Sequence, residues 1–207
     1  MSKRRDTRKW LSAHRADPYV RAAAAGDWRS RAAFKLAQID EKDRLLKPGM
    51  TVVDLGAAPG GWSQYCARAL KGHGRVVALD RLEMAPIDGV TAIRADFAEA
   101  AGLEALREAL GGDPADLVLS DMAPNLSGVT VADQVGVIYL AELALDFCGE
   151  VLKPGGDFLV KAFQGEGFDA LLGDMRRKFD RVAVRKPDAS RDASREQYLL
   201  GRNWLPP

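Results

Sequence analysis

Short apolar runs alternate with longer helical patterns along most of the 207-residue chain. The runs that predict strands cover residues 51–55, 75–80, 91–96, 116–121, 157–163, 180–186 and 196–201. The patterns that predict helices cover residues 30–46, 61–71, 99–110, 132–152 and 167–178. Near-continuously apolar strands that alternate with helices are typical of a mainly parallel sheet with helices on both faces. The pattern therefore predicts an α/β protein with a Rossmann-like architecture.

The connection between the last two predicted strands sets the direction of one of them. It reads PDASRDASR (residues 187–195), which is too short for the crossover that parallel strands need. One of the two strands must therefore run antiparallel. We expect a seven-stranded, mostly parallel sheet with one antiparallel strand near its carboxyl end. The chain length suits a single domain of this kind.

Charge is distributed unevenly, although the net charge is only +1. Residues 1–35 carry ten Lys and Arg against three Asp and Glu, whereas the remaining residues carry a net charge of −6. A basic segment on an acidic body indicates a polyanionic partner. Three aromatic residues, Trp10, Tyr19 and Trp28, favour RNA over a merely solvated tail, because rings stack on exposed bases. We therefore divide the chain into a basic, RNA-contacting arm, residues 1–29, and a single domain, residues 30–207.

Four acidic residues stand at the ends of the first four predicted strands: Asp54, Asp80, Asp96 and Asp121. Ligands of such sheets bind at the carboxyl ends of the parallel strands. Four carboxylates there would repel a dinucleotide pyrophosphate, but they suit S-adenosylmethionine, which has a sulfonium, an ammonium group and a ribose diol. Asp80 is placed to accept the ribose hydroxyls.

The loop GAAPGG, residues 56–61, supports the same ligand. It lacks the GxGxxG pattern of dinucleotide-binding folds. Its small residues still allow close backbone approach, and the helix that follows can receive the methionine carboxylate at its N-terminus.

Four longer motifs identify a family. GAAPGGWSQ, SDMAPNLSG, LKPGGDFLVKAFQG and SREQYLLG occur in this order, and SRAAFKL precedes them. Together they resemble the FtsJ/RrmJ family of RNA ribose 2′-O-methyltransferases from about residue 28 to residue 201. The chain length and the short basic arm resemble the bacterial members that methylate a uridine ribose in 23S ribosomal RNA.

The resemblance implies specific site residues. The catalytic tetrad Lys-Asp-Lys-Glu of the family falls on Lys35, Asp121, Lys161 and Glu196. The contacts with the methyl donor fall on Gly60, Trp62, Asp80, Asp96 and Asp121. The resemblance further implies S-adenosylmethionine as co-substrate and large-subunit ribosomal RNA as substrate, free or within the 50S particle or its precursor.

The chemistry needs a base, since a ribose hydroxyl attacks the methyl carbon well only after it loses its proton. Lys161 can accept this proton only when its amine is neutral, and solvent or Asp121 is the alternative acceptor. Glu196 reaches the same edge of the sheet only if its strand is the reversed one. Lys35 would come from the helix that leaves the basic arm. The alternative to a catalytic tetrad is a surface network of ion pairs.

Two rival functions outside the methyltransferases are weaker. An NAD-dependent oxidoreductase would need GxGxxG, and a non-catalytic RNA-binding protein would not need both lysines and both acids. A methyltransferase of the same family that acts on tRNA stays open, because the tetrad does not define the RNA. The DMAPN segment also lacks the nucleophilic Cys of cytosine C5 methylation and the aromatic residue of base amino-group methylation.

The remaining features point to a cytoplasmic, monomeric protein without a metal. The amino terminus is basic but lacks an apolar signal core, and no apolar run approaches a membrane span. Cys66 and Cys148 lack a CxxC pattern, so we expect reduced, buried thiols. His14 and His73 have no partner at metal-ligand spacing.

Overall fold

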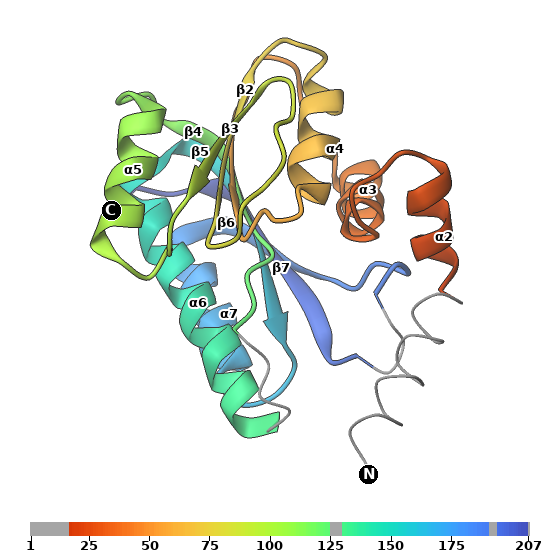
Figure 1. The fold of residues 1–207 in the computed structure, drawn as a ribbon. Helices are drawn as coiled ribbons and strands as arrows, with labels where there is room; N and C mark the ends of the chain where they lie inside the picture. The colour runs from red at the N-terminus through yellow and green to blue at the C-terminus, as the bar shows by residue number, and fades with distance from the viewer. Residues whose placement is uncertain (1–16, 125–129, 191–193, 207) are drawn as a thin grey trace.

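The computed structural model describes residues 17–124, 130–190 and 194–206 (Figure 1). Its strands are β1 (Thr51–Leu55), β2 (Arg75–Asp80), β3 (Val90–Arg94), β4 (Ala115–Ser120), β5 (Leu152–Phe163), β6 (Phe179–Arg185) and β7 (Glu196–Trp204). Its helices are α2 (Pro18–Ala25), α3 (Ala32–Asp43), α4 (Gly61–Leu70), α5 (Ala100–Leu110), α6 (Thr130–Val151) and α7 (Phe168–Lys178).

The strands form one seven-stranded sheet in the order β3-β2-β1-β4-β5-β7-β6. The pairs β3–β2, β2–β1, β1–β4 and β4–β5 are parallel, while β7 is antiparallel to both β5 and β6. This confirms the predicted mixed sheet, and it identifies β7 as the reversed strand. The short connection from β6 to β7 therefore returns the chain into the sheet between β5 and β6.

Helices cover both faces of the sheet, as predicted (Figure 1). On one face Leu36 of α3 and Cys66 of α4 pack against strand residues such as Val52 and Leu159. On the other face residues of α5, α6 and α7 pack against Val53 and Val160. Successive side chains of each strand point to opposite faces of the sheet, so a separate hydrophobic core forms on each face.

Several element boundaries differ from the sequence-based prediction. Helix α3 begins at Ala32 rather than at residue 30, and it ends at Asp43 rather than at residue 46 because Arg44 adopts a left-handed conformation with φ of 53°. Strand β3 ends at Arg94, two residues before Asp96, whose carboxylate accepts a hydrogen bond from the Ala98 amide and turns the chain. Strand β5 begins five residues earlier than predicted, with an irregular register between Leu152 and Asp157.

The segment before α3 is packed against the domain. Asp17 caps α2 by accepting a hydrogen bond from the Tyr19 amide, and it pairs with Arg31. The Tyr19 ring lies 5.6 Å from that of Phe34, while the Arg68 guanidinium lies 4.2 Å from the centre of the Trp28 ring. Tyr19 and Trp28, predicted to stack on RNA, thus contact side chains of the protein. Trp10 lies outside the described residues.

No helix in the described part of the chain is long and apolar enough to cross a membrane.

Candidate active site

Strand order brings the four tetrad residues together. Lys161 lies near the carboxyl end of β5, and Asp121 directly follows β4, its parallel neighbour. Glu196 begins β7 and pairs with Phe163 at the end of β5, because β7 is reversed. Lys35 lies in the first turn of α3, on the face that covers this part of the sheet. Lys35 and Glu196, which are 161 positions apart in the sequence, therefore lie together at the carboxyl edge of the parallel strands.

Two ion pairs connect the tetrad residues. Lys35 Nζ lies 2.6 Å from Glu196 Oε1, and the two side chains are each only 13% exposed. Lys161 Nζ lies 3.1 Å from Asp121 Oδ1 and donates to the Asp121 backbone oxygen at 2.5 Å. Ion pairs this shielded from solvent are far less screened than surface pairs. The four side chains therefore form a solvent-shielded cluster, and their catalytic role stays a prediction.

Tyr198 links the two pairs and was not predicted from sequence. Its hydroxyl donates to Asp121 Oδ1 at 3.0 Å and accepts from Lys35 Nζ at 3.3 Å. Burial raises the pKa of Tyr198 well above its ordinary value, and the Asp121 carboxylate adds to this. The phenol therefore stays protonated and acts as a donor. The one available sequence signal was its spacing, two residues after Glu196 on the same face of a strand.

Asp121 is held as a carboxylate. Burial raises the pKa of Asp121, but the charges of Lys161 and Lys35 and the hydrogen bonds from Lys161 and Tyr198 together keep it below its ordinary value. An ionised Asp121 can orient the Lys161 amine and accept a hydrogen bond from a substrate hydroxyl, but it is a weak proton acceptor.

A cavity of about 480 Å³ opens beside this cluster, and Asp121 belongs to both. Three of the predicted donor contacts, Asp80, Asp96 and Asp121, line it together with Gly56 and Ala58 of the Gly/Ala loop. A cavity with several carboxylates fits a ligand that carries positive charge and hydroxyls. It has the chemistry predicted for the methyl-donor site.

Backbone amides orient the carboxylates of Asp80 and Asp96. Asp80 accepts hydrogen bonds from the amides of Ala58 and Leu82, one on each carboxylate oxygen. Asp96 accepts one from the Ala98 amide and lies 3.6 Å from Arg81. Each carboxylate oxygen retains a lone pair for a ligand hydroxyl or amino group.

Gly60 and Trp62 do not line the cavity. Gly60 has φ of 105°, and a side chain there would meet Met84 at 2.8 Å, so glycine is required for the turn. Trp62 is 2% exposed, donates to the Ala32 carbonyl oxygen at 2.8 Å and packs 5.6 Å from Tyr198. The two residues shape the loop and support Tyr198. Their direct contact with a donor stays a prediction.

Asp54 lies behind the Gly/Ala loop rather than in the cavity. It is fully buried, its Oδ2 accepts a hydrogen bond from the Ser63 hydroxyl at 2.6 Å, and its Oδ1 has no partner. Burial raises the pKa of Asp54 to about 7, and the charges of Asp121 and Asp80 contribute in the same direction. Of the four predicted strand-end acids, it is the one that faces the protein interior.

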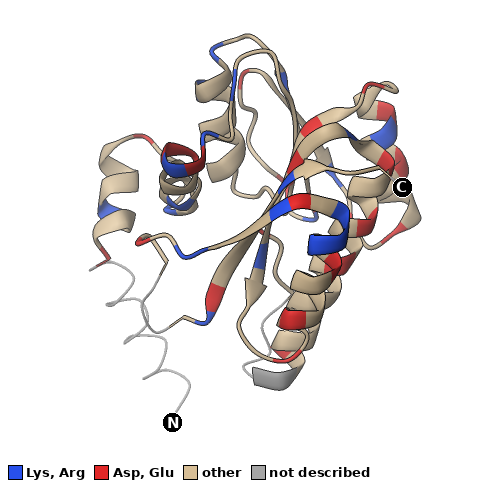
Figure 2. Cartoon of the chain, turned by 180° about the vertical axis from the view of Figure 1, so that it is seen from behind, with Lys and Arg blue, Asp and Glu red and all other residues tan. Residues whose placement is uncertain are grey.

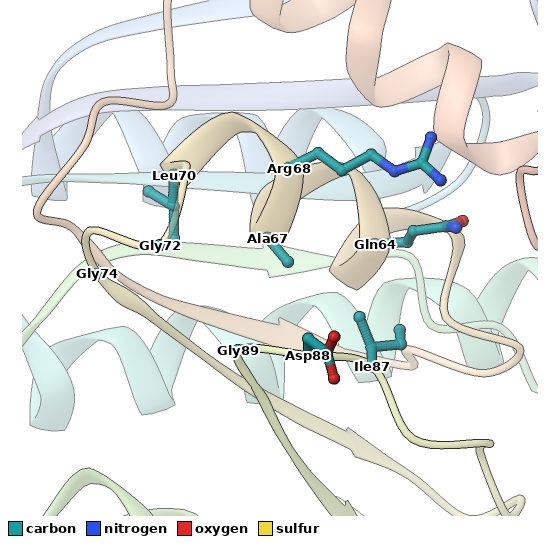
Figure 3. A pocket seen from close by; sticks show the side chains of 9 residues that line it. All are labelled: Gln64, Ala67, Arg68, Leu70, Gly72, Gly74, Ile87, Asp88 and Gly89. Atoms are coloured by element: carbon teal, nitrogen blue, oxygen red, sulfur yellow. The ribbon is translucent and has the colours of Figure 1, made fainter.

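A second hollow of about 440 Å³ lies along α4 and contains none of the predicted site residues (Figure 3). Gln64 and Ala67 lie across it from Ile87 and Asp88, while the Arg68 side chain runs along α4 away from them (Figure 3). It has a single carboxylate and runs along the helix flank toward the Gly72–Gly74 turn. It does not match the donor chemistry.

Metal ligands do not gather in the described residues, where no group of three or more His, Cys, Asp or Glu could hold an ion. Cys66 and Cys148 are both buried free thiols.

Several known proteins are similar to this chain in sequence and in fold. The FtsJ-like methyltransferase family model matches residues 28–204. The Ribosomal RNA large subunit methyltransferase E of Pseudomonas aeruginosa is 56% identical over 204 residues, which cover 99% of each chain. A Plasmodium falciparum structure described as a ribosomal RNA methyltransferase is 28% identical, with a TM-score of 0.78, over 87% of this chain and 100% of that chain.

A SAM-dependent O-methyltransferase from Thermotoga maritima shares the fold alone. It is 16% identical, with a TM-score of 0.56, over 86% of this chain and 66% of that chain. The family match spans the sheet, the Gly/Ala loop and all four tetrad residues. The chain therefore belongs to the FtsJ-like methyltransferase family.

Proposed function

We propose that this protein transfers the methyl group of S-adenosylmethionine to the ribose 2′-hydroxyl of a uridine in large-subunit ribosomal RNA, with Lys161 as general base. The observation that carries the proposal is the double role of Asp121. Asp121 lines the carboxylate-rich cavity and pairs with Lys161 at 3.1 Å. The donor and the proton acceptor would thus lie side by side.

The cavity residues fit the donor. Asp80 and Asp96 would hold its hydroxyl and amino groups, and Asp121 faces the part that carries positive charge. When bound, the donor supplies an electrophilic methyl group on a sulfonium. The carboxylates favour that charged form over the neutral product, which would assist product release.

The tetrad supplies orientation and proton transfer. Lys161 accepts the 2′-hydroxyl proton after its own extra proton has passed to solvent, and Asp121 keeps the amine in place through two contacts. General-base catalysis of this kind contributes about 10²–10⁴-fold in rate. Lys35 and Glu196, which pair directly and are linked to Asp121 by Tyr198, position the ribose and its neighbouring phosphate.

The names of the relatives support ribosomal RNA as the substrate. The Pseudomonas aeruginosa relative, which covers 99% of this chain, is named a large-subunit ribosomal RNA methyltransferase. The basic segment at the amino terminus supplies charge for a polyanion, since residues 1–16 alone contain six Lys and Arg. We place the enzyme in the cytoplasm, as a monomer that acts on the RNA or on the 50S particle.

The test is transfer of a labelled methyl group from S-adenosylmethionine to unmodified RNA. Free large-subunit rRNA, assembled large subunits and tRNA serve as parallel substrates. We expect label on large-subunit rRNA, in a nucleotide whose 3′ linkage resists alkali because its 2′-oxygen is methylated. Label on a base would contradict ribose chemistry, and label on tRNA alone would support the second candidate within the family.

A further inference from the structure

A basic surface extends from the end of the sheet opposite the active site along the outer strands β7 and β6. It consists of two adjoining hollows of about 350 and 400 Å³, which share Arg202. One lies beside residues 44–50 and the starts of β4 and β5, and the other lies between the end of α3 and strands β6 and β7. Lys161 is four residues along β5 from Asp157 in the first hollow, or about 13 Å at strand spacing. The first hollow is therefore separate from the tetrad, whereas the second reaches Arg185, which pairs with Tyr198 across β6 and β7.

Cations outnumber acids on this surface. The two hollows are lined by seven Lys and Arg side chains and three carboxylates, a surplus of four positive charges. This surplus contrasts with residues 36–207 as a whole, whose net charge is −6. Figure 2 shows Lys and Arg in blue on the central strands and on a helix at the left of the view, and these elements also carry acidic positions in red.

Each of the three carboxylates already has a cationic partner. Arg185 holds Asp43 through two hydrogen bonds of 2.6 and 2.7 Å. Lys153 pairs with Asp116, and Arg202 lies 3.2 Å from Asp157. These pairs neutralise one another and leave the other four cations uncompensated.

The four remaining cations are exposed. Lys42, Arg44, Lys47 and Arg181 form no ion pair with any residue in the described ranges. Burial raises the pKa of Asp157, and the positive charges of Lys47 and Arg181 partly offset this rise. They therefore lie around one carboxylate although they come from different parts of the chain.

Edge protection explains only part of this surface. Charged side chains on an edge strand prevent pairing with other chains, and Arg181 lies on β6, which is the edge strand. Lys42 belongs to a helix, however, and Arg44 and Lys47 follow it in a loop. Cations from a helix, a loop and a strand that gather without acidic partners indicate a shared polyanionic ligand.

We propose that this basic surface binds the phosphate backbone of a second segment of the RNA substrate, away from the nucleotide being methylated. The inference rests on the proposed function, in that the substrate is RNA. Arg181 and Arg185 span about 13 Å along β6, and the distance from β4 to β6 is about 14 Å across three strand spacings. A surface of this size contacts several phosphates, and it reads no sequence.

The experiment compares two triple variants of the full chain. Lys42→Gln, Lys47→Gln and Arg181→Gln remove three of the uncompensated charges. The matched control, Arg176→Gln, Arg177→Gln and Lys178→Gln, removes three charges from the last turn of α7, which covers the other face of the sheet. Binding to a 23S rRNA transcript is measured from low to high KCl, together with S-adenosylmethionine affinity and thermal unfolding.

We expect the first variant to bind the transcript at least about 10-fold more weakly than the parent near physiological salt. The slope of log affinity against log salt concentration should become less steep by about 2–3. Each lost phosphate contact lowers the magnitude of this slope by roughly 0.7–0.9. Donor affinity and thermal unfolding should match those of the parent, since the three side chains have no ion-pair partner to lose. The α7 variant should retain the parental slope.

Equal slopes for the first variant and the parent would overturn the inference, as would equal losses in both variants. Unchanged binding to naked RNA with weaker binding to assembled large subunits would assign the surface to a ribosomal protein and overturn it too. Methyl transfer by the parent is measured in parallel. If the parent methylates rRNA while the variant binds normally, only this inference fails. If the parent binds RNA through the surface but transfers no methyl group, the proposed function fails.

Discussion

Tyr198 donates its phenolic hydrogen to Oδ1 of Asp121 at 3.0 Å, and this hydrogen bond joins the two halves of the active site. One half is the Lys35–Glu196 pair, and the other is the Lys161–Asp121 pair. The same hydroxyl accepts from Lys35, so one buried phenol contacts both halves of the site.

Tyr198→Phe should lower the rate of methyl transfer in a single turnover by about 5–30-fold, because it removes a hydrogen bond to a charged group worth about 1–2 kcal/mol. The loss of this donor raises the pKa of Asp121, so the acidic limb of the pH–rate profile should move to higher pH. Tyr65→Phe is the control, because its hydroxyl donates to Asp40 at 2.9 Å outside the cavity. Equal rates and profiles for the two variants would remove Tyr198 from the site.

Lys161→Ala should reduce the chemical step by at least about 10²-fold, the lower range for loss of a general base. Lys161→Arg should be nearly as inactive, because a guanidinium keeps its proton at any working pH. Donor and RNA affinities should stay within a few-fold of the parent. Single-turnover rates with both substrates saturating provide the measurement, and a near-parental rate for Lys161→Arg would show that another group takes the proton.

Asp80→Ala should weaken S-adenosylmethionine binding by about 1.5–3 kcal/mol, since the ligand hydroxyls lose a charged acceptor. RNA affinity should hardly change. Asp88→Ala serves as control, because Asp88 lies in the hollow along α4 (Figure 3). Isothermal titration calorimetry measures the donor affinity of both variants. An unchanged affinity in folded Asp80→Ala would exclude Asp80 from the donor site.

Asp54 should make the protein less stable as pH rises from about 4 to 7. Its pKa is about 7 in the folded protein and 3.8 when unperturbed, so the folded state binds more protons across this window. Stability falls with pH wherever the folded state binds more protons, and the loss is complete above pH 7. Asp54→Asn should remove this dependence. Urea unfolding at pH 5 and pH 8 should show a smaller stability difference for the variant, and equal differences would contradict the raised pKa.

Deletion of residues 1–16 should leave the fold and donor binding intact while RNA binding weakens. The deleted segment contains six Lys and Arg, so the salt dependence of RNA binding should flatten if these residues contact phosphates. Deletion of residues 1–27 should in addition lower the melting temperature, because it removes α2 and the Asp17–Arg31 pair. An unchanged salt slope for the shorter deletion would identify the segment as a solvated tail.

The sequence by itself determined the layers of the fold and the chemistry of the site. Apolar runs of strand length, alternating with helical patterns, predict a sheet covered on both faces, because each element must bury its own apolar side. Acidic residues at the strand ends indicate where a ligand binds without any tertiary information. This is because the carboxyl ends of parallel strands lie at the same edge of the sheet. The motifs around Lys35, Asp121, Lys161 and Glu196 added the family and its tetrad.

Only the tertiary structure decided which residues meet. The reversal of β7 between β5 and β6 depends on packing across the whole sheet, and it places Tyr198 within hydrogen-bonding distance of Asp121. Burial separates the strand-end acids, since Asp54 faces the interior while Asp80, Asp96 and Asp121 line the cavity. The basic surface combines residues from α3, the loop after it and β6, which are far apart in sequence. Local patterns carry no information about such distant neighbours, because long-range packing selects them.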